Sequence, residues 1–196
     1  MVSGHPRPPR HDLLRLGSLT LPVEKRDPRM QPAHRFTYVD ISAVDQNSKE
    51  IASPSEVLGA DAPSRARQML ETGDVLVSTV RPNLNAVALV GPEHRSSFAS
   101  TGFCVLRCNS TQLDERYLFH WVRTRQFVDQ MVQLASGASY PAVSDRIVKN
   151  SEIPLPPIAE QRRIAAHLIG GPTAGNHRRI KRTRLETSGG DSRLGA

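Results

Sequence analysis

One short loop gathers side chains that could recognise a nucleic acid, Arg81-Pro82-Asn83-Leu84-Asn85. Arginine can form two hydrogen bonds with the edge of guanine in the major groove of DNA, and asparagine can do the same with adenine. Turn chemistry also accounts for the proline and the asparagines, and Arg81 can equally pair with Asp74 or with a phosphate. The loop is therefore a candidate contact with DNA bases, and a purely structural turn is the alternative.

A second polar segment, residues 136–150, combines hydroxyl groups with positive charge. Its side chains that could contact DNA are Ser139, Tyr140, Arg146 and Lys149. Hydroxyl and cationic side chains both donate hydrogen bonds to phosphate oxygens, as expected of a segment that lies along a DNA backbone. A structural role for Tyr140 and Pro141 stays open. We predict that this segment is a loop and that it shares one face of the domain with residues 81–85.

Catalysis by the chain itself is not indicated. The sequence contains no Asn-Pro-Pro-Tyr motif of amino-methyltransferases, no glycine-rich methyl-donor loop after a strand, no GxxxxGKS/T phosphate loop and no HExxH motif. Its carboxylates form no Asp…Glu-x-Lys arrangement that would hold a nuclease metal. Cys104 and Cys108 have no histidine near them, so we expect reduced, partly buried thiols on one side of a strand. We predict no catalytic residue, no metal site and no cofactor on this chain.

The elements that must position these loops follow from the apolar pattern. Strands are predicted at residues 36–44, 74–80 and 86–90, and a further strand pair at 96–99 and 102–108. Residues 62–73 favour a short helix or turn. Residues 114–135 carry the longest helical pattern, with Asp114 as its N-cap and Gly137 as its stop. These elements predict an α+β fold in which a twisted mixed β-sheet is backed by one packed helix.

After these elements the chain must leave the domain as an extended strap. The run Ile153-Pro154-Leu155-Pro156-Pro157 cannot be helical, because each proline pushes the residue before it out of the α-helical region. Pro157 itself suits the first turn of a helix, where its missing N–H costs nothing, and Glu160 favours the positive end of the helix dipole. A helix is therefore predicted to begin at about Pro157.

At these residues the chain resembles a known family. Residues 153–168 (IPLPPIAEQRRIAAHL) are similar to the segment that ends a target recognition domain in the specificity subunits of type I restriction-modification systems. Three further stretches resemble the same family in the expected order: 38–45 (YVDISAVD), 72–83 (TGDVLVSTVRPN) and 137–141 (GASYP). Together the four stretches span most of residues 13–168.

The resemblance implies a function that is shared with other chains. Specificity subunits of this family bind double-stranded DNA by sequence and dock a modification subunit, which methylates adenine with S-adenosylmethionine, while a separate restriction subunit cuts the DNA. S-adenosylmethionine, ATP and Mg²⁺ would then be bound by the partner subunits alone. Two alternatives stay open: an interaction remnant that no longer binds DNA, and the specificity module of a fused restriction enzyme.

The C-terminal part departs from the family. A complete specificity subunit carries two target recognition domains and two long helices, whereas this sequence has room for one domain. Residues 169–175 contain three glycines and one proline, which would cost a helix about 6 kcal/mol. We therefore expect the connecting helix to stop near Leu168 and the isolated chain to be monomeric. A natural half-subunit, a fragment and a shifted reading frame are the three readings of this ending.

Length and charge set the domain plan. The 196 residues suit one domain with appendages: a disordered leader at 1–10, the target recognition domain at 11–156, the start of the connecting helix at 157–168 and a basic, disordered tail at 169–196. Residues 36–168 hold 13 basic and 14 acidic side chains, so the net charge of +7 lies at the two ends and does not by itself indicate DNA binding. No membrane-length apolar run and no signal peptide are present, which predicts a cytoplasmic protein.

Overall fold

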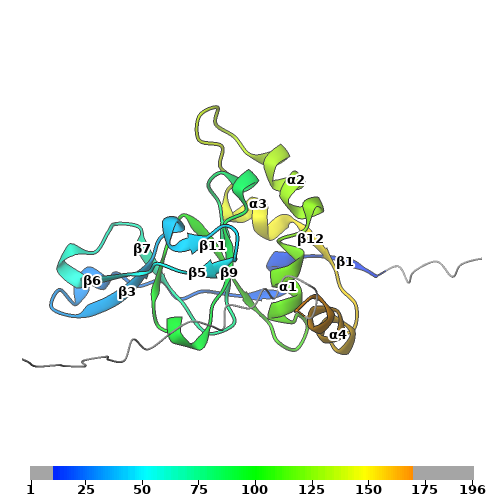
Figure 1. The fold of residues 1–196 in the computed structure, drawn as a ribbon, viewed down its shortest axis with the longest axis horizontal. Coiled ribbons are helices and arrows are strands. Elements are labelled where there is room, and N and C mark those ends of the chain that lie inside the picture. The colour runs from blue at the N-terminus through cyan, green and yellow to red at the C-terminus, as the bar shows by residue number, and fades with distance from the viewer. Residues whose placement is uncertain (1–10, 170–196) are drawn as a thin grey trace, which may run out of the picture.

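A computed structural model describes residues 11–169 of the chain (Figure 1). Within this range the α-helices are α1 (Glu115–Trp121), α2 (Arg125–Leu134), α3 (Asp145–Asn150) and α4 (Ile158–Ile169). The strands in order are β1 (Leu13–Arg15), β2 (Thr20–Leu21), β3 (Arg35–Val39), β4 (Val44–Asp45), β5 (Glu50–Ile51), β6 (Ser55–Leu58), β7 (Ala66–Met69), β8 (Val75–Ser78), β9 (Val87–Leu89), β10 (Phe98–Ser100), β11 (Phe103–Cys108) and β12 (Glu152–Pro154). The predicted leader, 1–10, and all of the predicted tail, 169–196, except Ile169 lie outside the described residues.

The strands form two four-stranded sheets and two strand pairs. One sheet has the antiparallel order β2-β11-β8-β9, and the other has the order β6-β3-β10-β7, in which β10 runs parallel to β3. The strand pairs are β1 with β12 and β4 with β5. The predicted α+β class with a mixed sheet is therefore confirmed. The strands predicted at 74–80 and 86–90 correspond to β8 and β9, which pair antiparallel.

The predicted pairing of residues 96–99 with 102–108 is wrong, because β10 and β11 belong to different sheets. A register shift between Ala99 and Ser100 turns the chain out of the first sheet. Gly102 then passes so close to Ile41 that an added Cβ would lie 2.6 Å from the Cδ1 atom of that side chain. The missing side chain allows this approach, so the chain changes sheets at Gly102 instead of folding back as a hairpin.

Each face of β8 and β11 packs into a different buried cluster. Val75 and Val77 join Cys104, Leu106 and the side chains of the helices in the first cluster. On the opposite faces, Leu76, Phe103 and Val105 pack with Val39 and Leu70 between the two sheets. Successive residues of a strand point to opposite faces, which is why the near-continuous apolar runs of β8 and β11 serve both clusters. Burial of each large side chain contributes about 1.5–3 kcal/mol relative to exposure.

The helix predicted at residues 114–135 is two helices, which corrects the sequence analysis. Asp114 caps α1 as expected, since its carboxylate accepts the backbone N–H groups of Arg116 and Tyr117 at 3.1 Å. The chain then breaks at Thr124, whose hydroxyl accepts the N–H of Phe127 and so caps α2 as a separate helix. The break changes the helical phase: Phe127 and Met131 are buried, while Val132, which the single-helix pattern placed inside, is exposed.

Residues 66–69, predicted as part of a helix or turn, form strand β7 instead. The Gln68 side chain is buried and its amide nitrogen donates to the carbonyl oxygens of Ser100 and Phe103, both at 2.9 Å. Those two carbonyls lie on either side of the change of sheets described above. Long-range pairing with β10 therefore outweighs the weak local preference of this segment.

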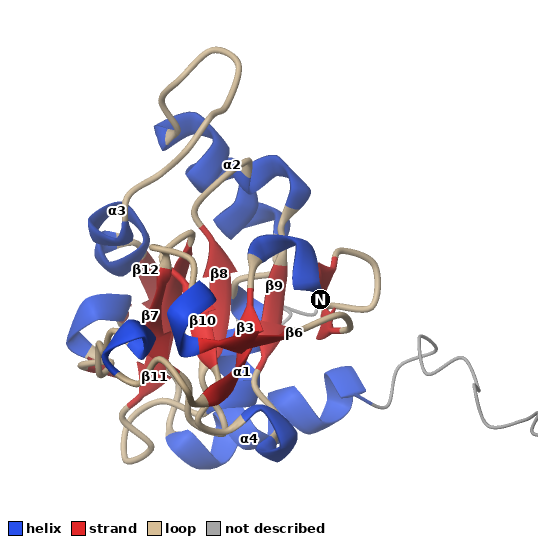
Figure 2. Ribbon diagram, turned by 90° about the vertical axis from the view of Figure 1, so that its left-hand side faces the viewer, coloured by secondary structure: helices blue, strands red, loops and turns tan. Residues whose placement is uncertain are grey.

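The strap and the helix after it follow the prediction closely. Residues 152–154 pair as β12 with β1, and α4 begins one residue after Pro157, whose carbonyl accepts the N–H groups of Glu160 and Gln161. The helix continues to Ile169, the last described residue, one residue past the predicted stop near Leu168, and the glycines and proline of 170–175 lie outside the described residues. Figures 1 and 2 show α4 at one end of the strands, and α2 and α3 toward the other end. None of the described helices is long and apolar enough to cross a membrane.

Both cysteines are free thiols on one side of β11, as the sequence predicted. Burial raises the pKa of each from 9.0 to about 12. We expect neither Cys104 nor Cys108 to react with iodoacetamide at pH 8 until the chain is unfolded, because the thiolate is the reactive form. Between about pH 9 and 12 the unfolded chain releases protons that the folded chain retains, so these thiols make stability fall as the pH rises through that window. Mass spectrometry of alkylated protein with and without urea checks the first point, and rapid labelling of the native chain would contradict it.

Candidate nucleic-acid interface

The loop between β8 and β9 is held in an uncommon backbone conformation. Arg81 and Asn85 are both left-handed, with φ of 48° and 45°, and they flank a 3₁₀ turn at Pro82–Leu84. The turn is closed by hydrogen bonds from Leu84 N–H to Arg81 O and from Asn85 N–H to Pro82 O. A non-glycine residue in this region costs on the order of 1–3 kcal/mol, and such costs concentrate at functional sites. The surrounding contacts must therefore stabilise the loop.

Arg81 obtains that support from the segment that was predicted to lie beside it. Its N–H donates to Pro141 O at 2.7 Å, and its guanidinium lies 4.8 Å from the centre of the Tyr140 ring. Two residues before Arg81, the carbonyl of Thr79 accepts Val143 N–H at 2.8 Å. The 141–143 segment therefore runs along the end of β8. Arg81 is exposed and Tyr140 keeps 68% of its surface accessible. The two residues form a stacked, solvent-facing pair.

The tip that carries Ser139 and Tyr140 is a closed turn. Ser136 and Ala142 exchange two backbone hydrogen bonds, 3.0 and 2.9 Å long, at its base. Gly137 has φ of +102°, and a Cβ there would lie 2.9 Å from the carbonyl oxygen of Tyr140. Only glycine can adopt this positive φ without strain and leave room for the Tyr140 carbonyl. Figures 1 and 2 show the loop between α2 and α3 projecting beyond both helices. Ser139 and Tyr140, which belong to this loop, are both exposed.

The two asparagines of the loop differ. Asn83 is exposed, whereas the Asn85 side chain faces inward and its Nδ2 donates to the carbonyl of Val122 at 3.2 Å. The Oδ1 atom of Asn85 is buried and has no hydrogen-bond partner within residues 11–169. Lys49 Nζ donates to the backbone carbonyl of Asn85 at 2.5 Å. Asn85 therefore fixes the loop to the end of α1. The contact between Lys49 and this loop could not be predicted from the sequence, because Lys49 lies 36 residues before Asn85.

The predicted loop at residues 136–150 ends in a short helix, α3, which corrects the sequence analysis. Ser144 caps this helix by accepting Ile147 N–H, and Val148 is buried in the cluster that also holds the helices. Arg146 is exposed on α3, while Lys149 is half-buried with its backbone carbonyl close to Gly17. In the described part of the chain, neither basic residue forms a hydrogen bond or ion pair with the 81–85 loop. The structure thus brings Arg81 and Tyr140 together and leaves Arg146 and Lys149 on a neighbouring element.

Asp74 is not the partner of Arg81. Its buried carboxylate accepts from Arg107 Nε at 2.9 Å and Nη2 at 2.8 Å, and from the backbone N–H of Glu71 at 2.8 Å. The hydrogen bond to Asp74 raises the pKa of the Arg107 guanidinium further above its ordinary value. The Arg81 guanidinium therefore has no contact with Asp74, and it contacts the Tyr140 ring and solvent instead. Asp74 and a phosphate of DNA are the two alternative partners that the sequence predicts for Arg81. Because Asp74 is paired with Arg107, only the phosphate remains of these two.

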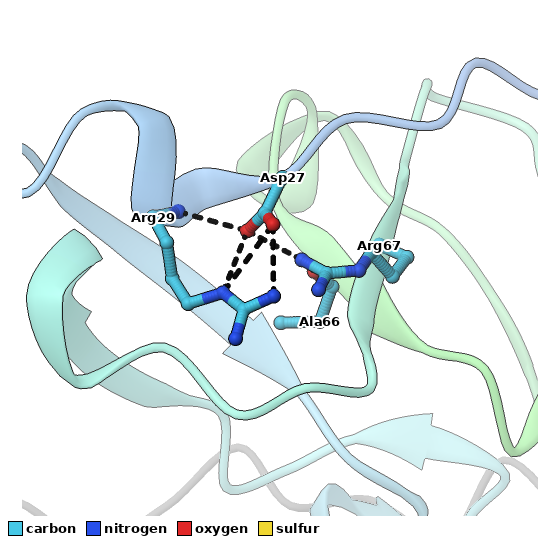
Figure 3. Close-up of polar contacts among 4 residues, drawn as sticks. All are labelled: Asp27, Arg29, Ala66 and Arg67. Atoms are coloured by element: carbon cyan, nitrogen blue, oxygen red, sulfur yellow. Dashed lines mark hydrogen bonds and ion pairs between the residues drawn. The ribbon is translucent and has the colours of Figure 1, made fainter.

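A further basic cluster lies away from this loop, beside the other four-stranded sheet. Asp27 accepts hydrogen bonds from Arg29 and is also paired with Arg67 Nη1 at 2.5 Å (Figure 3). The hydrogen bond from Arg29 is the largest cause that holds the pKa of the Asp27 carboxyl well below its usual range. Asp27 also borders a cavity of about 530 Å³ whose lining includes Glu56, Glu93 and Arg95. Because the carboxylate of Asp27 is paired with Arg29 and Arg67, we interpret this cluster as structural: it stabilises the loop before β3.

Metal-dependent chemistry has no candidate site within the described range: no three side chains of His, Cys, Asp or Glu in residues 11–169 gather closely enough to hold an ion. The exposed groups at the loop ends are instead a guanidinium, an amide, a hydroxyl and a phenol. Such groups bind by hydrogen bonding, stacking and charge.

Comparison with known proteins identifies the family. The family model described as type I restriction modification DNA specificity domain matches residues 67–169. The type I restriction enzyme EcoDI specificity subunit of Escherichia coli is 24% identical over 113 residues, which are 58% of this chain and 24% of that protein.

Two solved structures agree with the computed fold. The crystal structure of the HsdS subunit from Thermoanaerobacter tengcongensis matches with a TM-score of 0.77 at 45% identity, over 86% of this chain and 43% of that chain. A structure described in terms of complex assembly and conformational transition of the type I restriction-modification system matches with a TM-score of 0.78 at 45% identity, over 85% of this chain and 43% of that chain.

The chain thus spans less than half of the two solved chains and about a quarter of the curated relative. Three of the four motifs that suggested the family, 72–83, 137–141 and 153–168, lie inside the region matched by the family model. That region covers more than half of the sequence, and the fold agrees with it. The chain therefore belongs to the family of type I restriction-modification DNA specificity domains, and its described residues include a single target recognition domain.

Proposed function

We propose that this chain binds double-stranded DNA in a sequence-specific manner and itself carries out no catalysis. The observation that carries the proposal is the contact between Arg81, on the strained loop between the buried strands β8 and β9, and Tyr140, on the projecting tip beside it. A guanidinium held over an aromatic ring loses less side-chain freedom when it contacts a base, and the rigid strands fix its position. Membership of the family agrees with this function.

The proposed DNA-facing surface consists of Arg81 and Asn83 from the β8–β9 loop, Ser139 and Tyr140 from the projecting tip, and Arg146 and Lys149 from α3. Arg81 and Asn83 would contact base edges, while the hydroxyl and basic groups would contact phosphates. We assign Asn85 to positioning the loop, because its amide already donates to Val122 O. This surface lies away from α4, which leaves α4 free for partner subunits.

The partners follow from the same proposal. A modification subunit would bind S-adenosylmethionine and methylate adenine, and a restriction subunit would use ATP and Mg²⁺, so this chain would need no cofactor. The cytoplasmic location that the sequence predicts is part of the same proposal. That the isolated chain is monomeric stays a prediction, and sedimentation of the purified chain at several concentrations checks it.

Selection from a random duplex library tests the proposed function. The purified chain should enrich a defined set of base pairs over several rounds, and the selected duplex should compete better than a scrambled one at the same salt concentration. Equal competition by all duplexes would contradict sequence-specific binding, and the interaction remnant would then be the better account.

Substitution of the loop residues separates base contacts from phosphate contacts. Arg81→Ala or Asn83→Ala should weaken the preference at one base position by roughly 1–3 kcal/mol, because a bidentate contact with one base is lost. Arg146→Ala should instead weaken binding to every duplex about equally. Competition assays with single-base variants of the selected duplex measure the difference, and the same uniform loss for all three variants would remove the distinction.

A further inference from the structure

Two cations from segments far apart in the sequence lie near the Asn85 end of the 81–85 loop. Lys49, from the turn between β4 and β5, donates its Nζ to Asn85 O at 2.5 Å. Asn85 in turn donates to Val122 O, and the next residue is Arg123, at the end of α1. Asn85 therefore links Lys49 to the residue before Arg123, while Arg81, in contact with Tyr140, lies at the opposite end of the same short loop.

Neither cation is neutralised by a carboxylate. Within residues 11–169, Lys49 and Arg123 take part in no ion pair, whereas Arg26, Arg95 and Arg125 each pair with a nearby acid. Asp45, at the start of the same turn as Lys49, accepts the backbone N–H groups of Asn47 and Ser48 at 2.7 and 2.9 Å. Burial is the main cause that lowers the pKa of Lys49, and repulsion from Arg123 lowers it further, while Asp45 acts in the opposite direction. The two charges thus repel each other without full compensation.

The geometry presents both cations for binding. Arg123 is exposed and its guanidinium lies 4.9 Å from the centre of the Phe119 ring, which limits its freedom. The Lys49 ammonium uses one of its three N–H donors on Asn85 O, so two remain. Lys49 is also held at φ of 61°, a conformation that favours glycine or asparagine, so either of these residues would be less strained in the turn than lysine.

We propose that Lys49 and Arg123 form a phosphodiester-binding site that anchors the DNA backbone beside the recognition loop, an inference that rests on the proposed DNA-binding function. An anionic oxygen between the two side chains would relieve their repulsion and accept charge-assisted hydrogen bonds from both. The loop at 81–85 would then be fixed against DNA at both ends, by Arg81 with Tyr140 at one end and by Lys49 with Arg123 at the other. Two anchors would set the register of Asn83 against the base edges.

The test measures how binding depends on salt. Binding of the full chain to a short random-sequence duplex is followed by fluorescence anisotropy over a salt series, for the unmodified chain, Lys49→Gln and Arg123→Gln. Each substitution should reduce the slope of log K against log salt by about 0.9, the value expected for one lost phosphate contact. Lys49→Arg keeps the charge and should keep most of the slope. The matched control is Arg95→Gln, which removes a charge that is paired with Glu71 at the far end of β9 and should leave the slope unchanged. Thermal unfolding of each variant confirms that it is folded.

The outcomes separate this site from the proposed function. An unchanged slope in both variants, with a base preference still present in competition, would overturn the phosphate site and leave sequence-specific binding intact. A reduced slope without any base preference would support the site and contradict specific recognition. Absence of binding to every duplex by the folded, unmodified chain would overturn both.

Discussion

Replacing Asp74 by alanine should destabilise the domain by about 3–5 kcal/mol, because it would leave the Arg107 guanidinium partly buried without its counter-ion. The Asp74 carboxylate is 1% exposed and the Arg107 side chain 21%. The pair joins β11 to the segment before β8, and Arg107 Nη2 also donates to Met69 O at 3.0 Å. Loss of the carboxylate would therefore loosen three segments at once.

Urea unfolding of Asp74→Ala measures this effect, and the exposed ion pair next to it provides the control. Glu71→Ala removes the partner of Arg95, whose side chain is 67% exposed, and should change the free energy of unfolding by no more than about 1 kcal/mol. The double variant Asp74→Ala with Arg107→Met should recover part of the loss, because no unpaired charge is then left inside. Equal destabilisation by Asp74→Ala and Glu71→Ala would show that burial of the Asp74 pair has no energetic consequence.

The second large effect is expected at Gln161, a fully buried polar side chain on α4. Its Oε1 accepts Asp114 N–H at 2.9 Å, and its Nε2 donates to Gln112 O at 2.9 Å and to Pro156 O at 2.8 Å. Gln161→Leu would leave one backbone donor and two carbonyls without these partners. At about 1–3 kcal/mol for each unsatisfied group, the loss should reach about 3 kcal/mol or more.

The loss at Gln161 should be partly local, which gives it a separate measurement. Amide hydrogen exchange in α4 should lose its protection at concentrations of urea where β8 and β11 remain protected, because Gln161 fastens α4 to the start of α1. The same substitution at Gln133, which is exposed on α2, serves as the control and should have little effect on exchange in α4. Unchanged protection of α4 in Gln161→Leu would contradict the idea that this residue holds the helix in place.

The elements predicted best from the sequence are those fixed by local chemistry. Proline geometry set the start of α4 to within one residue, and the Asp114 carboxylate capped α1 where the pattern placed it. The strands β8 and β9 followed from apolar runs with a polar loop between them. In each of these cases the deciding atoms lie within a few residues of one another, so the sequence contains the whole interaction.

The break at Thr124 was missed although its signal is local, because the Thr124 hydroxyl caps α2 through Phe127 N–H and a single helical period passes over such a cap. The errors in the strands have the opposite cause. Strand β7 exists because Gln68 and its neighbours pair with β10, and β10 and β11 lie in separate sheets with Gly102 between them close to Ile41. Segments that are distant in sequence decide these features, and local propensity does not contain that information.

The candidate interface divides in the same way. The sequence by itself determined the family, through four motifs in order, and it selected the loop at 81–85 because arginine and asparagine suit base edges. Only the tertiary structure decided that Tyr140 stacks on Arg81, that Asn85 turns inward, and that Lys49 reaches Asn85 from a turn 36 residues earlier. The chemistry of a side chain is a local property that any sequence displays, whereas its neighbours are fixed by the packing of strands and helices that are far apart along the chain.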